Sequence, residues 1–491
     1  MWAEGERMVS NKVQAVVLAA GQSTRFKTGR TKLLEKICGQ EMILYSTRML
    51  EALDIPTTVV VGYQKDSVIE VIQKRHNDFV SFVVQQEQRG TGHAVQCTMQ
   101  IWERDFILIM NGDMPLVTSD IIEKLYEQHV TTGAEVSFVI SHCEDTQSAY
   151  GRVIKSDSGI KIVEAKHFTG DPHEHCWINA GVYLISRTFL QEQIARIEQN
   201  EKTKEFYLTD LIEMASLQRL GVCTVIAPYD RIRGINNFQE LWAAEQVKRA
   251  ELIKYWMDNG VHFSVAQSVH IDLDVQIGAG SYIGCGVHLL GNTIIGKNSK
   301  INENSSLDNV IMGDGSEVLQ HCVLTDCTLG NNVKVGPFAH VRDQSVILDN
   351  SIIGNFVEVA RTTIGNGTKA KHLAYLGDAQ IGNNVNIGAG TITCNHNGSS
   401  KNKTNIGDNS FIGSNNTLVA PLTIEKNAYT AAGSVITNDV PAQALAIARA
   451  RQINKEGYAH KLQKKETAND RTNTLSFLGA QKNKTTTAQR S

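Results

Sequence analysis

An aliphatic residue recurs at every sixth position through much of the second half of this 491-residue chain. Glycine or asparagine stands beside it, as in the segments IGAGSYIG, IGNNVNIGAG and IGDNSFIG. This repeat is typical of a parallel β-helix, because each repeat forms one short strand and one corner, and stacked coils bury the aliphatic residue. The frame runs through residues 277–307, 323–359 and 406–436. A β-sandwich would not keep one period for so long, so we predict a β-helix after about residue 265.

Two segments interrupt the repeat. They are Gly365–Leu376 (GNGTKAKHLAYL) and Cys394–Thr404 (CNHNGSSKNKT). Insertions in a solenoid tend to leave the coil as loops, and such loops often carry binding function. We therefore expect both segments to be loops that contribute to a site.

The first half has a different pattern, in which short apolar runs alternate with segments of helical spacing. The apolar runs predict buried strands at Val13–Leu18, Thr57–Val61, Phe79–Val84 and Phe106–Met110. The spacing predicts helices at Ile43–Leu53, Val68–Lys74 and Asn237–Asp258. Alternating strands and helices indicate an α/β domain, Rossmann-like, with a mostly parallel sheet. We divide the chain into an α/β domain (1–238), a helical linker (239–260), a β-helix domain (261–459) and a polar, disordered tail (460–491).

Composition excludes several classes of protein. A formal net charge of −3 gives no general attraction to nucleic acid. No apolar run reaches the roughly 18 residues that a membrane span needs, and the N-terminus has no apolar stretch typical of a secretion signal. The nine cysteines are scattered and form no C-x-x-C pair, so we expect free thiols in a reducing cytoplasm.

Phosphate chemistry is indicated just after the first strand, in LAAGQSTRFKTGRTK. A glycine turn lets backbone N–H groups approach a phosphate, and Arg25 and Lys32 add positive charge for a triphosphate. The segment matches neither G-x-G-x-x-G nor G-x-x-x-x-G-K-[ST], which excludes the Rossmann dinucleotide-binding motif and the P-loop.

A second glycine loop, QQEQRGTGHAV, opens a helix and has polar groups that could bind the edge of a nucleotide base. In the segment FILIMNGDMPL, Asp113 comes at the end of a buried strand, where a carboxylate suits Mg²⁺.

Taken in order, these motifs resemble one family. The set LAAG…TR…K, QRGTGHA, NGDMPL, YGRVI, VEAKH, INAGVY, EFYLTDLI and GINN precedes GPFA, NFVEV, KAKHLAYLGDA and NIGAGTITCN. This order resembles the bacterial bifunctional N-acetylglucosamine-1-phosphate uridylyltransferases/glucosamine-1-phosphate acetyltransferases, over about residues 10–460. The resemblance implies a left-handed β-helix, a homotrimer with a shared acetyl-transfer site, and acetyl-CoA and UTP as co-substrates with Mg²⁺. It also implies synthesis of UDP-N-acetylglucosamine for peptidoglycan and lipopolysaccharide precursors.

The resemblance also assigns the uridylyltransferase site. Contacts to the uridine nucleotide and the sugar would come from Leu18, Ala19, Ala20, Gly21, Lys32, Gln85, Gly90, Thr91, Asn111, Gly112, Asp113, Gly151, Glu164, Asn179 and Asn236. Asp113 and Asn236 would bind Mg²⁺, while Arg25 and Lys32 would act on the triphosphate. Asn111 stands where the family has an aromatic residue.

For acetyl transfer, His372 would be the catalytic base and Glu358 the acid that orients it. Contacts to glucosamine phosphate would come from Arg342, Tyr375, Asn386 and Lys401. Contacts to acetyl-CoA would come from Ala389, Asn395, His396, Ser414, Ala432 and Arg449. His396 stands where the family usually has tyrosine.

The most serious departure from the family is Ala360, which follows NFVEV where the family has a phosphate-binding lysine. Loss of a charge-assisted bond costs about 1.5–3 kcal/mol, which predicts weaker substrate binding. Arg361 is adjacent, but neighbouring strand residues point to opposite faces, so it could substitute only if a turn breaks that alternation.

Two alternatives to a bifunctional enzyme remain. The first is a uridylyltransferase whose β-helix serves only as a trimerisation scaffold, which Ala360 favours. The second is a non-catalytic regulatory or assembly subunit, which predicts loss of Lys32, Asp113 or Asn236; all three are present.

Overall fold

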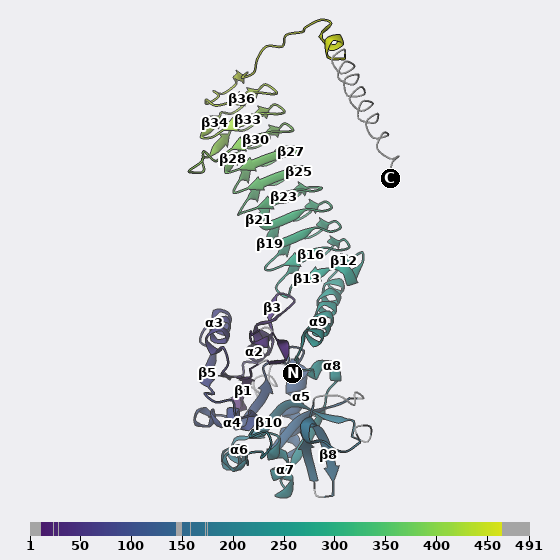
Figure 1. The fold of residues 1–491 in the computed structure, drawn as a ribbon. Coiled ribbons are helices and arrows are strands. Elements are labelled where there is room, and N and C mark those ends of the chain that lie inside the picture. The colour runs from purple at the N-terminus through teal and green to yellow at the C-terminus, as the bar shows by residue number, and fades with distance from the viewer. Residues whose placement is uncertain are drawn as a thin grey trace, which may run out of the picture.

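The computed structural model describes residues 11–463 apart from 23, 28, 144–149, 158, 172 and 174. Figure 1 shows an α/β unit at one end of the molecule and a long column of coils at the other, with helix α9 between them. The tail predicted for 460–491 lies almost wholly outside the described residues.

The α/β unit is built on one mixed sheet with the strand order β11-β7-β10-β6-β1-β4-β5. The strands of this order are β1 (Val13–Ala19), β4 (Thr57–Val61), β5 (Val80–Val84), β6 (Phe106–Asn111), β7 (Val136–His142), β10 (Trp177–Ser186) and β11 (Val222–Ile226). All neighbours in this order are parallel except β10, which runs antiparallel between β6 and β7. Two further strands, β8 (Arg152–Ser156) and β9 (Gly159–Val163), extend the sheet as an antiparallel pair beside β10. All four predicted strands are present, and β1, β4 and β6 are largely buried because helices cover both faces.

The helices of this unit include α2 (Met42–Ala52), α3 (Lys65–His76), α4 (Thr91–Gln96), α5 (Ser119–Thr132), α6 (Arg187–Gln193), α7 (Asp210–Leu217) and α8 (Tyr229–Ile232). The predicted helices near 43–53 and 68–74 are therefore correct. A short hairpin, β2 (Lys36–Ile37) and β3 (Gln40–Glu41), reaches the coils, where Leu273 N donates to Cys38 O at 2.9 Å.

The predicted linker helix is α9 (Phe238–Asp258). Asn237 begins it, since its side chain accepts a hydrogen bond from Glu240 N at 2.9 Å. The helix packs on β2 and on the first coil, and Ile253 is buried in the core of the coils. Because one helix and one hairpin both bridge the two parts, the α/β unit is fixed against the base of the column.

The column is a continuous parallel β-helix that runs from β12 (His262–Phe263) to β37 (Leu445–Ala446). Almost every strand points an aliphatic residue into a single core, as predicted for Ile277–Leu307 and for most of the later frame. The strands pair from coil to coil: Leu289 with Leu307, Leu307 with Leu324, and Leu324 with Val341. The second and third of these pairs are each one residue closer in sequence than the first, so the coil length is not constant.

This variation corrects one predicted core position. Val323 is 46% exposed, whereas its neighbour Leu324 is completely buried. Leu324 and Leu329 both point inward, and they lie one residue closer together than the repeat requires. Counting back one full repeat from Leu329 therefore reaches Val323 instead of Leu324, and such a one-residue slip moves a side chain to the other face.

The first predicted loop is also wrong. Within Gly365–Leu376, residues from Lys369 onward belong to strand β27 (Lys369–Gly377), which pairs with β25 (Ile352–Ala360). The second prediction is confirmed, because β30 (Ile392–Cys394) and β31 (Thr404–Ile406) flank an extruded loop. The loop lengthens its coil, so Thr393 pairs with Leu418 across the insertion.

Candidate active sites

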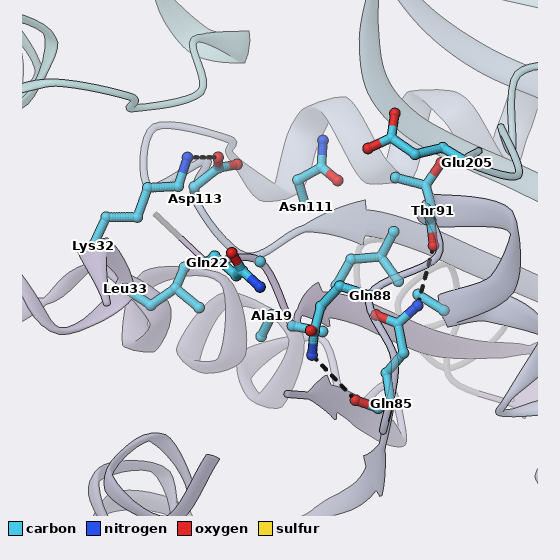
Figure 2. A pocket seen from close by; sticks show the side chains of 15 residues that line it. Ala19, Gln22, Lys32, Leu33, Gln85, Gln88, Thr91, Asn111, Asp113 and Glu205 are labelled. Carbon is cyan, nitrogen blue, oxygen red and sulfur yellow. Dashed lines mark hydrogen bonds and ion pairs between the residues drawn. The ribbon is translucent and has the colours of Figure 1, made fainter. Parts of the chain in front are cut away.

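A cleft of about 470 Å³ lies at the carboxyl ends of the central strands, where open α/β sheets bind ligands. Its lining residues are Leu18, Ala19, Ala20, Gly21, Gln22, Lys32, Leu33, Gln85, Gln88, Gly90, Thr91, Ala94, Asn111, Asp113 and Glu205. Figure 2 shows how loops that follow β1, β5 and β6 bring these side chains around one hollow. Most of the residues predicted from the sequence, from Leu18–Gly21 to Asp113, therefore lie together.

Lys32 lies at the centre of the polar contacts in this cleft. Its Nζ donates to Asp113 Oδ2 at 2.5 Å and to Asn236 Oδ1 at 2.9 Å. A carboxylate and an amide oxygen therefore converge on one cation. These oxygen donors fit Mg²⁺, which binds a few protein oxygens and completes its shell with phosphate and water. Among the described residues, no group of three His, Cys, Asp or Glu side chains could hold a metal ion.

The predicted sugar contacts form a second group near the cleft. Asn179 N donates to Gly151 O at 2.9 Å, and Asn179 Nδ2 donates to the Tyr183 hydroxyl at 2.6 Å. The Thr209 hydroxyl donates to Glu164 Oε1 at 2.9 Å. Burial raises the pKa of the neighbouring Asp210 to about 6, and the charge of Glu164 adds to the rise. The structure therefore brings together three predicted residues that do not line the cleft itself: Gly151, Glu164 and Asn179.

Two further predicted residues, Arg25 and Gly112, do not line the cleft. Arg25 is exposed on a short 3₁₀ helix, Thr24–Phe26. Gly112 packs closely against helix α2, because an added Cβ would come within 2.7 Å of Ile43 Cδ1. Asn111 packs against Gly181, where a Cβ would lie 2.6 Å from Asn111 Nδ2.

The prediction missed five lining residues: Gln22, Leu33, Gln88, Ala94 and Glu205. Glu205 begins the motif EFYLTDLI, and this segment packs on the loop QRGTG. Gly92 N donates to Phe206 O at 2.8 Å, and the Arg89 guanidinium lies 5.0 Å from the centre of the Phe206 ring. The motif EFYLTDLI could therefore have pointed to Glu205, but only the folded structure shows that Glu205 lines the cleft.

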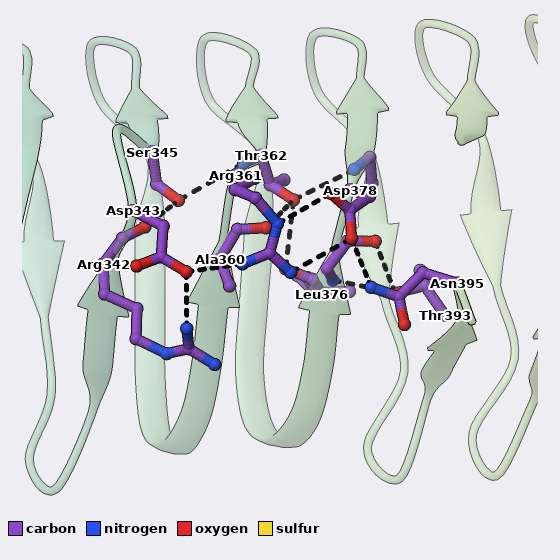
Figure 3. A network of polar contacts seen from close by, with 12 residues as sticks. Arg342, Asp343, Ser345, Ala360, Arg361, Thr362, Leu376, Asp378, Thr393 and Asn395 are labelled. Carbon is purple, nitrogen blue, oxygen red and sulfur yellow. Dashed lines mark hydrogen bonds and ion pairs between the residues drawn. The ribbon is translucent and has the colours of Figure 1, made fainter. Parts of the chain in front are cut away.

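In the β-helix, charged side chains from successive coils form one continuous network, shown in Figure 3. Arg342 Nη2 donates to Glu358 Oε1 at 2.6 Å, and Arg342 Nη1 donates to Asp343 Oδ2 at 2.5 Å. Arg361 donates to Asp343 and, through Nε and Nη2, to Asp378 at 2.7 and 3.0 Å. Glu358 and Arg342, both predicted from the sequence, are thus in direct contact.

Arg361 belongs to this network because the chain turns directly after Ala360. Arg361 has a φ of 51°, which breaks the strand alternation and brings its guanidinium to the face that carries Arg342. Ala360 itself is completely buried, in register between Arg342 and Gly377. The condition under which Arg361 could reach this face is therefore met.

His372 does not contact Glu358 within this chain. Its Nδ1 lies 2.8 Å from Asn355 Oδ1, and strand pairing places Asn355 opposite His372 but Glu358 opposite Tyr375. The predicted orientation of His372 by Glu358 is corrected for one chain, because the two residues are three register positions apart. The ring of His372 is exposed and held by an amide oxygen.

The predicted acetyl-CoA residues divide into a column and a loop. Ala389, Ser414 and Ala432 occupy one corner of successive coils, since Asn415 N donates to Ala389 O at 2.7 Å and Gly433 N to Ser414 O at 2.8 Å. Arg449 follows them, because a Cβ on Gly433 would lie 3.7 Å from Arg449 Cδ.

The loop group is anchored at its base. Asn395 is buried, with its Nδ2 3.4 Å from the Tyr375 hydroxyl and bonded to Asp378. His396 and Lys401 form a β-bridge across the exposed loop. Asn386 lies half-buried on β29 (Asn386–Ile387), one coil beyond Lys369 on β27.

An exposed ladder of large side chains runs beside His372. His321, Phe338, Phe356 and Leu373 occupy one corner of successive coils, all with positive φ, between 37° and 57°. The His321 and Phe338 rings stack at 5.1 Å, and the Phe338 and Phe356 rings at 5.3 Å. Phe338, Phe356 and Leu373 are 49%, 57% and 63% exposed. We call these four residues, three with aromatic rings and one leucine, the aromatic ladder.

All nine cysteines are free thiols, as predicted. No helix in the described part of the chain is long and apolar enough to cross a membrane.

Two family models match the chain. A MobA-like NTP transferase domain matches residues 15–212, and the bacterial transferase hexapeptide (six repeats) matches residues 274–309 and 326–361. The hexapeptide match and the parallel coils together identify a left-handed β-helix, as the resemblance implied.

Curated relatives match almost the whole chain. The "Bifunctional protein GlmU" of Caldanaerobacter subterraneus is 41% identical over 455 residues, which cover 92% of this chain and 98% of the relative. The proteins of the same name from Geobacillus sp. (strain WCH70) and Exiguobacterium sibiricum are 38% and 40% identical. They cover 93% and 90% of this chain, and 100% and 99% of their own lengths.

Proposed function

This chain belongs to the bifunctional GlmU family, and we propose from that premise which residues carry each of its two activities. The enzyme synthesises UDP-N-acetylglucosamine. It transfers an acetyl group from acetyl-CoA to glucosamine 1-phosphate, and a uridylyl group from UTP to N-acetylglucosamine 1-phosphate with release of pyrophosphate. The convergence of Asp113 and Asn236 on Lys32 is the observation that best supports the first site.

Uridylyl transfer takes place in the cleft. A phosphate oxygen of the sugar 1-phosphate attacks the α-phosphorus of UTP in line, and pyrophosphate leaves. The N–H groups of the glycine turn bind phosphate oxygens, while Lys32 and Arg25 neutralise the charge that develops on the leaving group. Gln85 and Gln88 supply polar groups for the base edge, and Glu164 and Asn179 hold the sugar. Asp113 and Asn236 would bind Mg²⁺, which supplies further neutralisation of the phosphates when bound.

Acetyl transfer takes place on the β-helix. His372 takes the proton that the amine of glucosamine 1-phosphate releases as it attacks the thioester carbonyl. Asn355 fixes the ring through Nδ1, which leaves Nε2 to face the amine. Arg342, Tyr375, Asn386 and Lys401 hold the sugar phosphate. Asn395, His396 and the column formed by Ala389, Ser414, Ala432 and Arg449 hold acetyl-CoA.

We further propose that three chains assemble through the β-helix, with the aromatic ladder as a contact surface. The ladder exposes large apolar side chains beside His372, and a second copy would cover them and complete the site. Glu358 would then face the His372 of a neighbouring copy rather than the His372 of its own chain.

Because acetyl-CoA and UTP are cytoplasmic metabolites and all nine cysteines are free thiols, we propose a cytoplasmic location. We also propose the domain division at 1–238, 239–260 and 261–459.

Two substitutions test the division of labour. Lys32→Met should reduce pyrophosphate release by about a hundredfold or more, because transition-state charge is no longer neutralised, and leave acetyl transfer unchanged. His372→Ala should do the reverse, with a loss of about 10²–10⁴-fold in thiol release. Both rates are measured on each purified variant. A variant that lost both activities while keeping its thermal unfolding midpoint would contradict the assignment.

The alternative is a uridylyltransferase whose β-helix is only a scaffold. Ala360 is the observation that favours it, since the phosphate-binding lysine is missing. It predicts that His372→Ala has no effect on any measurable rate.

A further inference from the structure

Arg361 lies at the middle of a hydrogen-bonded network that crosses four coils. In order, its members are Glu358, Arg342, Asp343, Arg361, Asp378 and Asn395. The coils concerned contain β23 (His340–Arg342), β25, β27 and β30. Figure 3 shows the Arg361 guanidinium between the carboxylates of Asp343 and Asp378.

The geometry of the corner explains why Arg361 bridges these carboxylates. Asp343, Arg361 and Asp378 occupy the same corner of three successive coils, with φ of 57°, 51° and 50°. The backbone confirms the stacking, since Asp378 N donates to Ala360 O at 3.0 Å and Arg361 N to Arg342 O at 3.5 Å. Parallel strands lie about 4.8 Å apart, so one guanidinium spans the gap to the coil on either side.

The six side chains of the network form two halves, and among the side-chain-to-side-chain hydrogen bonds of the described residues Arg361 alone joins these halves. One half, Glu358–Arg342–Asp343, contains the proposed sugar-phosphate residue Arg342. The other half, Asp378–Asn395, contains the proposed acetyl-CoA residue Asn395, which also contacts the Tyr375 hydroxyl. Without Arg361, no hydrogen bond in the network connects Asp343 to Asp378.

Arg361 is also heavily committed to these carboxylates. Nε, Nη1 and Nη2 each donate one hydrogen bond to Asp343 or Asp378, which uses three of the five N–H groups of the guanidinium. The bond from Arg361 lowers the pKa of Asp378, whose side chain is 13% exposed. Loss of Arg361 would leave a poorly hydrated carboxylate without its main counter-ion, and the side chains bonded to it would move.

We propose that Arg361 is a positioning residue that holds the sugar-phosphate and acetyl-CoA subsites in one arrangement, acting through Asp343 on Arg342 and through Asp378 on Asn395. This role rests on the function proposed above, since it uses the assignments of Arg342 and Asn395. It differs from that of a direct phosphate ligand, which would act on one substrate only.

Binding measurements on the full-length protein test this role without requiring turnover. The affinities for coenzyme A and for glucosamine 1-phosphate are measured separately by titration calorimetry. The proteins are wild type, Arg361→Gln and Arg361→Lys. Lys334→Gln serves as the matched control, because it removes another ion pair of the column, with Glu317 at 2.8 Å, outside the network.

Arg361→Gln should weaken binding of both ligands about tenfold, since charge-assisted contacts on both sides are lost. Arg361→Lys should recover part of the loss, because an ammonium can pair with one carboxylate, and Lys334→Gln should bind like wild type. Pyrophosphate release by every variant should match wild type, which shows that the chain has folded.

A loss confined to glucosamine 1-phosphate would overturn the proposal and make Arg361 a direct phosphate ligand. Unchanged affinities for both ligands would also overturn it. If wild type bound both ligands without transferring acetyl, yet Arg361→Gln weakened both, the positioning role would hold and the proposed acetyl transfer would fail. Normal acetyl transfer by Arg361→Gln with unchanged affinities would leave the proposed function standing and reject the positioning role.

Discussion

At the scale of single residues, we predict that position 360 affects how tightly the β-helix holds glucosamine 1-phosphate. Ala360 lies between Arg342 and Gly377 in strand register, so a longer side chain would start beside Arg342. Ala360→Lys should lower the KM for glucosamine 1-phosphate about tenfold, because it adds a charge-assisted bond to phosphate. Thiol release at varied amino-sugar concentration measures this KM.

Ala360→Met is the matched control, since it adds similar length without charge. It should leave the KM unchanged or raise it. If Ala360→Lys also leaves the KM unchanged, another group already holds the phosphate and the missing lysine is of no consequence.

Residue patterns in the sequence predicted well which side chains meet in the cleft, but less well which side chains meet on the β-helix. Lys32, Asp113 and Asn236 come from three separate motifs and meet within hydrogen-bonding distance. Asn355, in contrast, was not identified as the partner of His372. The two residues lie one coil apart, and their pairing depends on the local coil length, which the aliphatic repeat does not reveal.

At the scale of elements, coil length determines which side chains enter the core. The aliphatic repeat was sufficient to predict the β-helix, because the same inward position recurs in almost every strand. It was not sufficient where a coil is one residue short, since Val323 and Leu324 are both aliphatic and either could occupy the inward position. Pairing with the neighbouring coil, not the local sequence, selects Leu324.

A pair of substitutions at this slip tests the assigned frame. Leu324→Ala should destabilise the β-helix by about 2–5 kcal/mol, because it leaves a cavity in a fully packed core. Val323→Ala, at an exposed position, should change stability by less than about 0.5 kcal/mol. Thermal and urea unfolding followed by circular dichroism give both values. The opposite order would restore the uninterrupted six-residue frame.

At the scale of the whole molecule, one helix and one hairpin fix the α/β unit to the base of the column. Acetyl transfer is assigned to coils farther along the column, so the two sites lie on separate parts of the chain (Figure 1). From these assignments we expect the intermediate, N-acetylglucosamine 1-phosphate, to pass through solution between the two sites. This separation is the reason that single substitutions are expected to affect one activity at a time.

The proposed assembly of three chains through the aromatic ladder is also tested at the scale of the whole molecule. Phe356→Asp should dissociate the proposed trimer, because it places a charge in the middle of the aromatic ladder. Sedimentation should then give the mass of one chain, whereas wild type gives three times that mass. Lys300→Asp, which also introduces a carboxylate on the column but away from the ladder, should remain a trimer. A trimeric Phe356→Asp protein would place the contact surface elsewhere.

The central claim is that this one chain performs both transfers. The most direct measurement supplies purified wild-type protein with acetyl-CoA, glucosamine 1-phosphate, UTP and Mg²⁺, and follows free thiol and pyrophosphate side by side. A parallel reaction starts from N-acetylglucosamine 1-phosphate and UTP. We predict thiol release that depends on the amino sugar, and pyrophosphate release in both reactions. Pyrophosphate from the acetylated sugar without any thiol, even at millimolar amino sugar, would contradict the claim and leave the β-helix as a scaffold.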